Sequence, residues 1–220
     1  MFITIEGPDG AGKSTQIKLL HEYLTAQNMD VVLTREAGGT PLAEKIRSML
    51  FTRDAGDWEY FSEVLLLYAG RLEHVEKKIK PALNNGSFVV CDRFADSTLV
   101  YQGYGRGIER EKILNVEALT LGDFKPDLTL VLDIDVKKGL ERTGVRFGEN
   151  NDGSNTEDKF ERLGLGFHEK IRAGFLDIAS KNPDRCVVIN ADQPIESIFS
   201  DIKTVIDARI KAGGSHVAAG

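Results

Sequence analysis

Residues 2–15 read FITIEGPDGAGKST, a short β-rich run followed by the pattern G-x-x-x-x-G-K-S. The apolar run predicts a strand over 2–6, and the apolar spacing that follows predicts a helix over 13–27. A glycine-rich loop between a strand and a helix can point its backbone N–H groups at a phosphate, and the positive end of the helix dipole adds to the attraction. The stretch therefore predicts a phosphate-binding loop, or P-loop.

Two side chains of this loop have distinct chemical roles. Lys13 supplies a cation for the β- and γ-phosphates of a nucleotide, and the hydroxyl of Ser14 is placed to hold Mg²⁺. We expect nucleotide contacts from Gly7, Pro8, Asp9, Gly10, Ala11, Gly12, Lys13, Ser14 and Thr15. Guanine-specific switch proteins share this loop, but they usually carry an N-K-x-D motif that the sequence lacks. The loop alone indicates a bound nucleotide and no particular reaction.

Strand-like and helix-like segments alternate along the 220 residues. We expect strands at 2–6, 31–34, 88–92, 128–133 and 186–189, and helices at 13–27, 40–50, 58–83, 109–121, from 136, 157–180 and 194–211. Continuous apolar strands separated by helices predict an α/β fold, with a doubly wound, five-stranded parallel sheet covered on both faces. We interpret residues 1–211 as a single domain and 212–220 as a flexible tail.

Polar residues at the predicted strand ends indicate where a ligand binds. Parallel sheets bind ligands at the carboxyl ends of their strands. The residues expected to converge there are Glu6, Arg35, Asp92, Arg93, Asp133 and Ala191. The segment 144–158 is rich in Gly, Asn, Asp and Ser and lacks apolar periodicity, so we interpret it as a mobile lid that could exclude water from a transferred phosphoryl group.

The composition narrows the functional classes. The formal net charge is −6 and no Lys/Arg run occurs, which argues against a nucleic-acid polymer as partner. Neither a signal peptide nor a membrane-spanning apolar stretch is evident, so we expect a cytoplasmic protein without membrane contact. Cys91 and Cys186 lie in apolar runs and are expected to be buried thiols. The four histidines lack metal-ligand spacing and are expected on the surface or on helix faces.

Further motifs resemble those of bacterial thymidylate kinases, which are P-loop nucleoside monophosphate kinases. The matching pieces are E-G-x-D-G-A-G-K-S-T (6–15), T-R-E-x-G-G-T (34–40), E-V-L-L-L-Y-A-G-R (63–71), D-R-F-x-x-S-x-x-x-Y-Q-G (92–103) and P-D-L-T-L-x-L-D (126–133). The resemblance spans about residues 1–205. It implies transfer of the γ-phosphate of ATP to dTMP, giving dTDP and ADP, with Mg²⁺ as cofactor and a homodimer packed through long helices, for which the apolar stretch 61–72 is suited.

The resemblance also assigns roles to individual residues. It implies that Asp9 reaches the 3′-hydroxyl of the acceptor sugar, that Arg35 and Arg93 hold the acceptor phosphate, and that Arg71 donates to a thymine carbonyl. Tyr101 would crowd the 2′ position of the sugar. The full acceptor set is Asp9, Arg35, Leu67, Tyr68, Arg71, Arg93, Ser97, Thr98, Tyr101 and Gln102. Asp92 and Ser14 would hold the metal, directly or through water.

Three departures from the family pattern affect these roles. Leu67 replaces a Phe that stacks on thymine in the family, so stacking is weaker or Tyr68 substitutes for it. Ala37 replaces a Pro. The variable P-loop positions carry no basic residue, and related enzymes of this kind supply arginines from the lid instead. The candidates here are Arg142 and Arg146, which join Lys13, Arg93 and Asp9 as the predicted catalytic residues, and Arg142 is also expected near the ATP base with the 191–193 turn.

Two alternatives remain open at this stage. A kinase with a broader range of deoxynucleoside monophosphate acceptors is compatible with Leu67. A regulatory switch that hydrolyses its nucleotide slowly is compatible with the P-loop, and it differs from a kinase because an acceptor would not stimulate its turnover.

Overall fold

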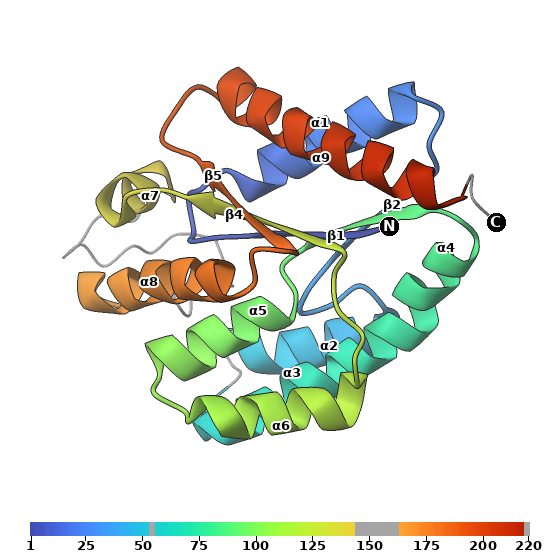
Figure 1. Ribbon diagram of the computed structural model, residues 1–220. Helices are drawn as coiled ribbons and strands as arrows, with labels where there is room; N and C mark the ends of the chain where they lie inside the picture. The colour runs from blue at the N-terminus through green and yellow to red at the C-terminus, as the bar shows by residue number, and fades with distance from the viewer. Residues whose placement is uncertain (53–55, 144–162, 218–220) are drawn as a thin grey trace.

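The computed structural model describes residues 1–52, 56–143 and 163–217. Over these residues, five parallel strands form one sheet in the order β2-β3-β1-β4-β5 (Figure 1). The strands are β1 (Phe2–Glu6), β2 (Val31–Arg35), β3 (Phe88–Asp92), β4 (Leu128–Asp133) and β5 (Cys186–Asn190). This arrangement confirms the predicted five-stranded parallel sheet, and every predicted strand agrees with an observed one to within a residue at each end.

Helices cover both faces of the sheet (Figure 1). They are α1 (Lys13–Ala26), α2 (Pro41–Phe51), α3 (Tyr60–His74), the π-helical turn η1 (Val75–Ile79), α4 (Lys80–Asn84), α5 (Ala95–Thr98), the π-helical turn η2 (Leu99–Gly105), α6 (Arg110–Leu121), α7 (Val136–Thr143), α8 (Leu165–Lys181) and α9 (Ile195–Val217). Within the described residues, no helix is both long enough and apolar enough to cross a bilayer.

The alternation of side chains along each strand produces two apolar cores. On one face, Ile3, Ile5 and Leu130 pack with α1 and α9. On the other face, Phe2, Val89 and neighbouring apolar residues pack with α3, η1, α5, η2, α6 and α8. Successive strand residues point to opposite faces, so strands buried on both sides need continuous apolar runs, as the sequence predicted.

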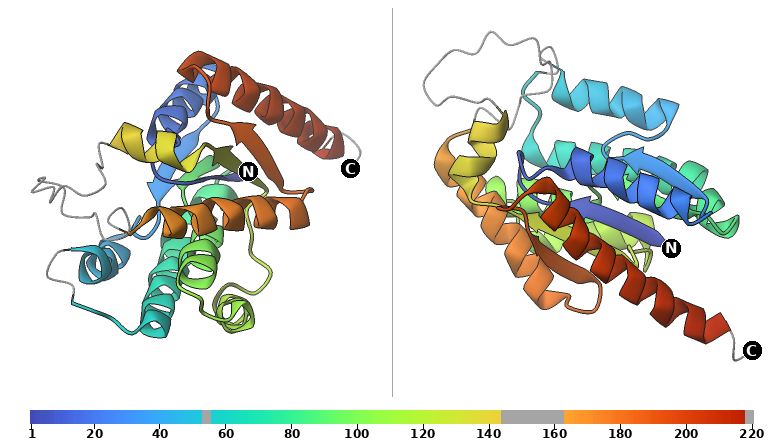
Figure 2. Two further views of the ribbon diagram at one scale, coloured as in Figure 1. Left: turned by 90° about the vertical axis from the view of Figure 1, so that its left-hand side faces the viewer. Right: turned by 90° about the horizontal axis from the view of Figure 1, so that it is seen from above.

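The parallel arrangement brings all five carboxyl ends to one edge of the sheet. Ile5 of β1 pairs with Asp92 of β3, and Glu6 of β1 pairs with Val131 of β4, so the loops after these strands emerge together. Figure 1 and Figure 2 show that α7 lies at this end of the molecule, whereas the C-terminal end of α9 lies at the opposite side. The functional residues are therefore expected near α7 and away from the C-terminus.

Several helical segments differ from the sequence-based prediction. The helical turns α5 and η2, over residues 95–105, were not predicted. Of the helix predicted over 157–180, the described residues 163 and 164 are not helical, and α8 begins at Leu165. The predicted helix over 58–83 is helical but contains the π-turn η1 before Pro81, which lacks an N–H group and interrupts the α-helical ladder. The last helix was predicted to end at Lys211, but it continues to Val217, because extending an existing helix is easier than starting one even through weak helix formers such as Gly. The predicted lid, 144–158, lies outside the described residues.

Candidate active site

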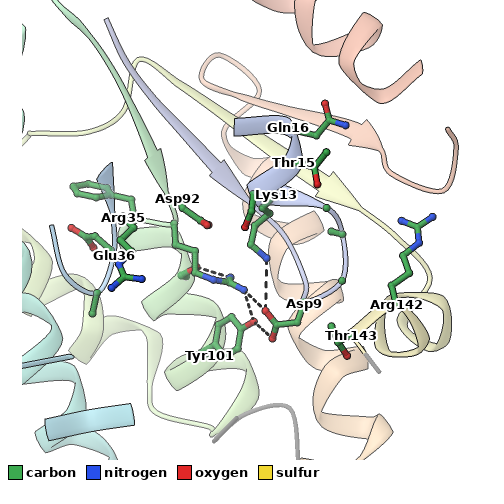
Figure 3. A pocket seen from close by; sticks show the side chains of 18 of the residues that line it. Asp9, Lys13, Thr15, Gln16, Arg35, Glu36, Asp92, Tyr101, Arg142 and Thr143 are labelled. Carbon is green, nitrogen blue, oxygen red and sulfur yellow. Dashed lines mark hydrogen bonds and ion pairs between the residues drawn. The ribbon is translucent and has the colours of Figure 1, made fainter. Parts of the chain in front are cut away.

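A cavity of about 1000 Å³ opens at the carboxyl ends of the strands. Its walls come from the P-loop, the loop after β2, α2, α3, the loop after β3, η2, α7 and the loop before α9. Figure 3 shows Lys13 and Asp9 in the middle of this cavity, with Arg35 and Glu36 on one side and Arg142 on the other. The structure therefore brings the predicted phosphate cradle and most of the predicted acceptor residues into one space.

The P-loop backbone depends on its glycines, including Gly10 and Gly12. Gly10 has φ of 77°, and a Cβ atom there would lie 1.9 Å from the carbonyl oxygen of Gly139 in α7. Gly12 has φ of 89° and immediately precedes α1. Such angles are strained for residues with a side chain. The two glycines let the loop turn tightly against α7 and present the N-terminus of α1 to the cavity, where an anion is stabilised.

Lys13 is buried at the centre of the cavity. Its Nζ atom donates to the carbonyl oxygens of Gly7, at 3.2 Å, and Pro8, at 3.0 Å, and lies 3.7 Å from Oδ1 of Asp9. Burial, together with the nearby guanidinium of Arg93, lowers the pKa of Lys13 to about 8. Asp9 to Thr15 line the cavity, whereas Gly7 and Pro8 contribute carbonyl groups that orient the lysine.

Arg93 connects the P-loop to the loop after β3. Its Nη2 atom donates to Oδ1 of Asp9 at 2.5 Å and to the hydroxyl of Tyr101 at 3.1 Å, and its Nη1 atom donates to the carbonyl oxygen of Gly7 at 3.2 Å. The Tyr101 hydroxyl donates in turn to Oδ2 of Asp9 (Figure 3). Burial alone would raise the pKa of Asp9, but Arg93 and Lys13 outweigh it, so the Asp9 pKa lies below its ordinary value.

A buried polar network holds Arg71 at the base of the cavity. Its Nε atom donates to Oε2 of Glu36 at 2.5 Å, and its Nη2 atom donates to the Thr98 hydroxyl at 2.8 Å. The other carboxylate oxygen of Glu36 lies 3.1 Å from Nδ1 of His74, whose Nε2 atom is 2.6 Å from the Thr34 hydroxyl. The remaining Nη1 atom of Arg71 is buried and has no hydrogen-bond partner among the described residues.

Tyr68 is not where the sequence-based hypothesis required it. Leu67 lines the cavity, whereas Tyr68 is fully buried and donates its hydroxyl to Glu117 at 2.8 Å. The Arg71 guanidinium lies 4.5 Å from the centre of the Tyr68 ring, so Tyr68 stabilises Arg71 through a cation–π contact on the core side. Adjacent side chains on a helix point about 100° apart, so Leu67 and Tyr68 cannot face the same way. In the structure, Leu67 faces the cavity and Tyr68 faces the core.

The other predicted acceptor residues occupy the same cavity. Arg35, Ser97, Thr98 and Gln102 line it, and Gln102 is almost completely buried. Arg35 is exposed and forms an ion pair with Glu44 of α2, with Nη2 and Oε2 separated by 3.0 Å. The predicted convergence of the Arg35 and Arg93 strand ends is therefore confirmed.

On the opposite side of the cavity, Arg142 of α7 lies beside the loop before α9. Its Nη1 atom donates to the carbonyl oxygen of Ala191 at 3.1 Å. Gln193, Pro194 and Ile195 continue this wall. Arg142 therefore lies beside the 191–193 turn, as the sequence-based hypothesis required. The other predicted lid arginine, Arg146, lies outside the described residues.

Ser14 and Asp92 are the residues that could hold a metal ion. Both line the cavity, and Oδ1 of Asp92 is buried without a hydrogen-bond partner in the described part of the chain. No group of three or more metal-binding side chains occurs among the described residues. This arrangement fits Mg²⁺, which is usually held by one or two protein ligands together with phosphates and water, better than a metal that needs an all-protein cage.

Several residues at the site were missed or misplaced by sequence reasoning. Glu36 and His74 form the network behind Arg71. The histidines were expected on the surface or on helix faces, and both His74 and His168 are buried. Arg47 and Phe51 of α2 line the cavity. The signals available for Glu36 were its position directly after the strand-end arginine and its place in the T-R-E-x-G-G-T motif. Nothing in the helical spacing indicated that α2 would face the ligand rather than solvent.

Comparisons with known proteins agree with this geometry. The family model described as "Thymidylate kinase" matches residues 5–202. The chain is 46% identical to a thymidylate kinase of Caulobacter vibrioides over 209 residues, covering 95% of this chain and 97% of that protein. It is 42% identical to one of Desulfovibrio desulfuricans, covering 97% and 98%. The crystal structure of a thymidylate kinase from Ehrlichia chaffeensis matches 94% of this chain and 98% of that chain, with a TM-score of 0.73 and 40% identity. The chain thus belongs to the thymidylate kinase family.

Proposed function

We propose that this chain transfers the γ-phosphate of ATP to dTMP, producing dTDP and ADP. The observation that carries the proposal is the position of Arg93, which lies at the end of β3 and donates hydrogen bonds to the P-loop residues Gly7 and Asp9. A kinase needs one cationic site for the donor phosphates and a second one for the acceptor phosphate, at a fixed distance from each other. Arg93 joins these two parts of the cavity.

The acceptor base is assigned to the wall around Arg71. Among the described residues, the buried Nη1 atom of Arg71 has no hydrogen-bond partner, which is costly unless a ligand accepts its hydrogen bond. A thymine carbonyl oxygen is such an acceptor. The hydroxyl of Thr98 and the amide of Gln102 lie on the same wall and supply further polar groups for the base edge.

The acceptor sugar and phosphate are assigned to the cluster around Asp9. The carboxylate of Asp9 accepts hydrogen bonds from Arg93 and Tyr101, so it is fixed where a 3′-hydroxyl could donate to it. The ring of Tyr101 would crowd a 2′-hydroxyl and so favour deoxyribose. Arg93 and Arg35 are two guanidinium groups that can grip a phosphate by paired hydrogen bonds.

The donor site combines the P-loop with α7 and the loop before α9. The phosphates of ATP would contact the backbone N–H groups of the P-loop and Lys13, and the base would lie near Arg142 and residues 191–193. The Lys13 pKa of about 8 leaves the ammonium form favoured at neutral pH, and a polyphosphate would favour it further. Arg142 and Arg146 are assigned to the charge that develops on the transferred phosphoryl group.

Mg²⁺ would be held by Ser14 and Asp92. When bound, the ion neutralises charge on the donor phosphates. The protein's own part is to place the donor and acceptor phosphates in line and to exclude water, because a phosphate oxygen is already a nucleophile and no general base is required. Residues 144–158 are assigned to the lid that closes over the transferred group.

A homodimer is the proposed assembly, with α3 and α6 at the interface. These helices contact each other on one side of the molecule (Figure 1). Their exposed apolar side chains include Leu65 at 49% and Leu119 at 87% of full exposure. Apolar side chains gathered on neighbouring helices are typical of a surface that a partner covers. Two buried free thiols, Cys91 and Cys186, agree with the proposed cytoplasmic location.

The acceptor preference is tested by measuring ADP release with dTMP, dUMP, UMP, CMP and dGMP. We expect the highest kcat/KM for dTMP. Another nucleotide as best acceptor would contradict the substrate assignment and favour a broader monophosphate kinase, for which Leu67 leaves room. A rate that no monophosphate stimulates would contradict the kinase mechanism and favour a hydrolytic switch.

A further inference from the structure

Glu6 is a buried acid to which the proposed reaction assigns no role. It ends β1 directly before the P-loop, and none of its surface is exposed to solvent. Its Oε1 atom accepts a hydrogen bond from the backbone N–H of Phe94 at 2.7 Å, and its Oε2 atom accepts one from the Ser97 hydroxyl at 2.6 Å. Both carboxylate oxygens are therefore used on the segment that follows β3.

The hydroxyl of Ser97 links Glu6 to Arg93 through two hydrogen bonds. A serine hydroxyl has one hydrogen, and here it points to Glu6, so the oxygen lone pairs of Ser97 face its other neighbours. One of these neighbours is Nη1 of Arg93, which donates to the Ser97 oxygen at 3.1 Å. The hydrogen bonds run in one direction, from the Arg93 guanidinium through the Ser97 hydroxyl to the Glu6 carboxylate.

Glu6 also stabilises the backbone conformation at Arg93. Arg93 has φ of 67°, a left-handed conformation that disfavours residues with a side chain and persists only where the surroundings impose it. The next N–H group, that of Phe94, is the one bound by Glu6. One carboxylate thus fixes the backbone after Arg93 and, through Ser97, the direction of its guanidinium.

We propose that Glu6 is a positioning residue for the acceptor phosphate, which it influences by holding Arg93 through Ser97 and the backbone of Phe94. The inference rests on the proposed role of Arg93 as a phosphate ligand. Glu6 itself touches no substrate. The other charged groups around it are Arg93, Asp96 and Lys13, and Arg93 is the one that Glu6 reaches through a hydrogen-bonded chain.

The inference is tested at pH 8, above the raised pKa of Glu6, by isothermal titration calorimetry. The binding of dTMP and of thymidine, which differ only in the phosphate, is compared between wild type and Glu6→Gln. The variant keeps the shape of the side chain but loses the charge and one acceptor oxygen. We expect dTMP to bind roughly tenfold more weakly, as for one hydrogen bond to a charged group, and thymidine to change by less than about twofold. ATP affinity is expected to remain within about twofold as well.

Asp96→Asn is the matched control. Asp96 is also a buried acid and lies on α5 beside Ser97, but its carboxylate forms a different ion pair, with Arg185, at 2.7 and 2.8 Å. If a substitution merely loosened α5, dTMP and thymidine would bind more weakly to the same extent, in Glu6→Gln and in Asp96→Asn alike. Equal losses of dTMP and thymidine binding in Glu6→Gln, or unchanged dTMP binding, would overturn the inference.

Two further variants distinguish a failure of the Glu6 inference from a failure of the proposed phosphate role of Arg93. Ser97→Ala interrupts the same chain without altering a buried charge, and it should reproduce the selective loss for dTMP even if Glu6→Gln does not fold. Arg93→Lys should also weaken dTMP selectively. If Arg93→Lys weakens dTMP binding more than thymidine binding and neither Glu6→Gln nor Ser97→Ala does so, Glu6 is not a positioning residue. The assignment of the acceptor phosphate to Arg93 is kept in that case. If Arg93→Lys weakens dTMP and thymidine binding equally, the assignment of the acceptor phosphate to Arg93 is wrong. The proposed role of Glu6 is then wrong as well.

Discussion

Replacing Glu36 with glutamine is expected to destabilise the fold through a single buried charge. The side chains of Glu36 and Arg71 are 3% and 2% exposed, and their Oε2 and Nε atoms are 2.5 Å apart. Glutamine can present its oxygen to Arg71 and its amide nitrogen to Nδ1 of His74, so both hydrogen bonds have a replacement. The substitution therefore removes the negative charge of the ion pair and leaves the guanidinium of Arg71 buried without its ion-pair partner.

The magnitude follows from this geometry. Breaking one side of a buried ion pair costs about 3–5 kcal/mol, because the remaining charge is still desolvated. Since the hydrogen bonds can re-form, we expect the lower end, about 3 kcal/mol. The Arg71 guanidinium also lies over the rings of Tyr68 and Phe94, at 4.5 and 5.4 Å, and these contacts remain in the variant. They offset part of the loss without supplying a counter-ion.

The assay is equilibrium unfolding in urea, followed by circular dichroism. With a urea dependence of about 3 kcal/mol per molar, the midpoint should fall by about 1 M. Glu44→Gln is the matched control, because it removes the partner of Arg35 from a pair whose side chains are 39% and 53% exposed. Exposed pairs contribute less than about 1 kcal/mol, so its midpoint should move by less than about 0.3 M. Equal shifts in the two variants would refute the reasoning from burial.

Two other predictions concern the P-loop and its preceding residue. Lys13→Ala should lower kcat by about 10²–10³-fold without changing the circular dichroism spectrum, and near-normal turnover would contradict the phosphate assignment. Burial, with a smaller contribution from Asp96, raises the pKa of Glu6 from 4.5 to about 7, so the folded protein binds this proton more tightly than the unfolded chain does. The resulting stabilisation is present below pH 4.5 and is lost as the pH rises through 7. The difference in unfolding free energy between Glu6→Gln and wild type should therefore shift in favour of the variant by up to about 3 kcal/mol as the pH rises from 5 to 8, measured by urea unfolding, and a pH-independent difference would contradict the shifted pKa.

The fold could be predicted from the sequence because its signals are local. Each buried strand is a continuous apolar run, and the P-loop pattern lies between its strand and its helix. The connection between Asp9 and Arg93 could not be predicted in this way, because 84 residues separate them and only the pairing of β1 with β3 brings them together. The strand-end argument placed Glu6, three residues before Asp9, and Arg93 at one edge, but it did not indicate a hydrogen bond between Asp9 and Arg93.

The candidate site was predicted less well where a helix turns toward the cavity. Tyr68 was a hypothetical contact for the base, and it lies instead behind Arg71. Apolar residues occupy both positions 67 and 68, so periodicity could not separate a cavity-facing residue from a core-facing one. Glu36 and His74 were missed for a related reason, because a buried polar network depends on partners that are distant in sequence. Of the two arginines expected at the transferring phosphoryl group, Arg146 lies beyond the described residues, so its role stays a prediction.

The hydrogen bonds shared by the two halves of the cavity bear on how such a site accelerates phosphoryl transfer. The protein has little covalent chemistry to perform, so the rate depends on holding two phosphates at the correct distance, and a misplacement of about 1 Å can cost about 10²-fold. Arg93 donates to the carbonyl of Gly7 and the carboxylate of Asp9 from the acceptor side, so a displacement of either loop is transmitted to the other. Behind Arg93, the connection continues through Ser97 at the cavity wall to the fully buried carboxyl group of Glu6. Substitutions at such residues should therefore affect turnover even though none of these residues contacts the transferred phosphoryl group.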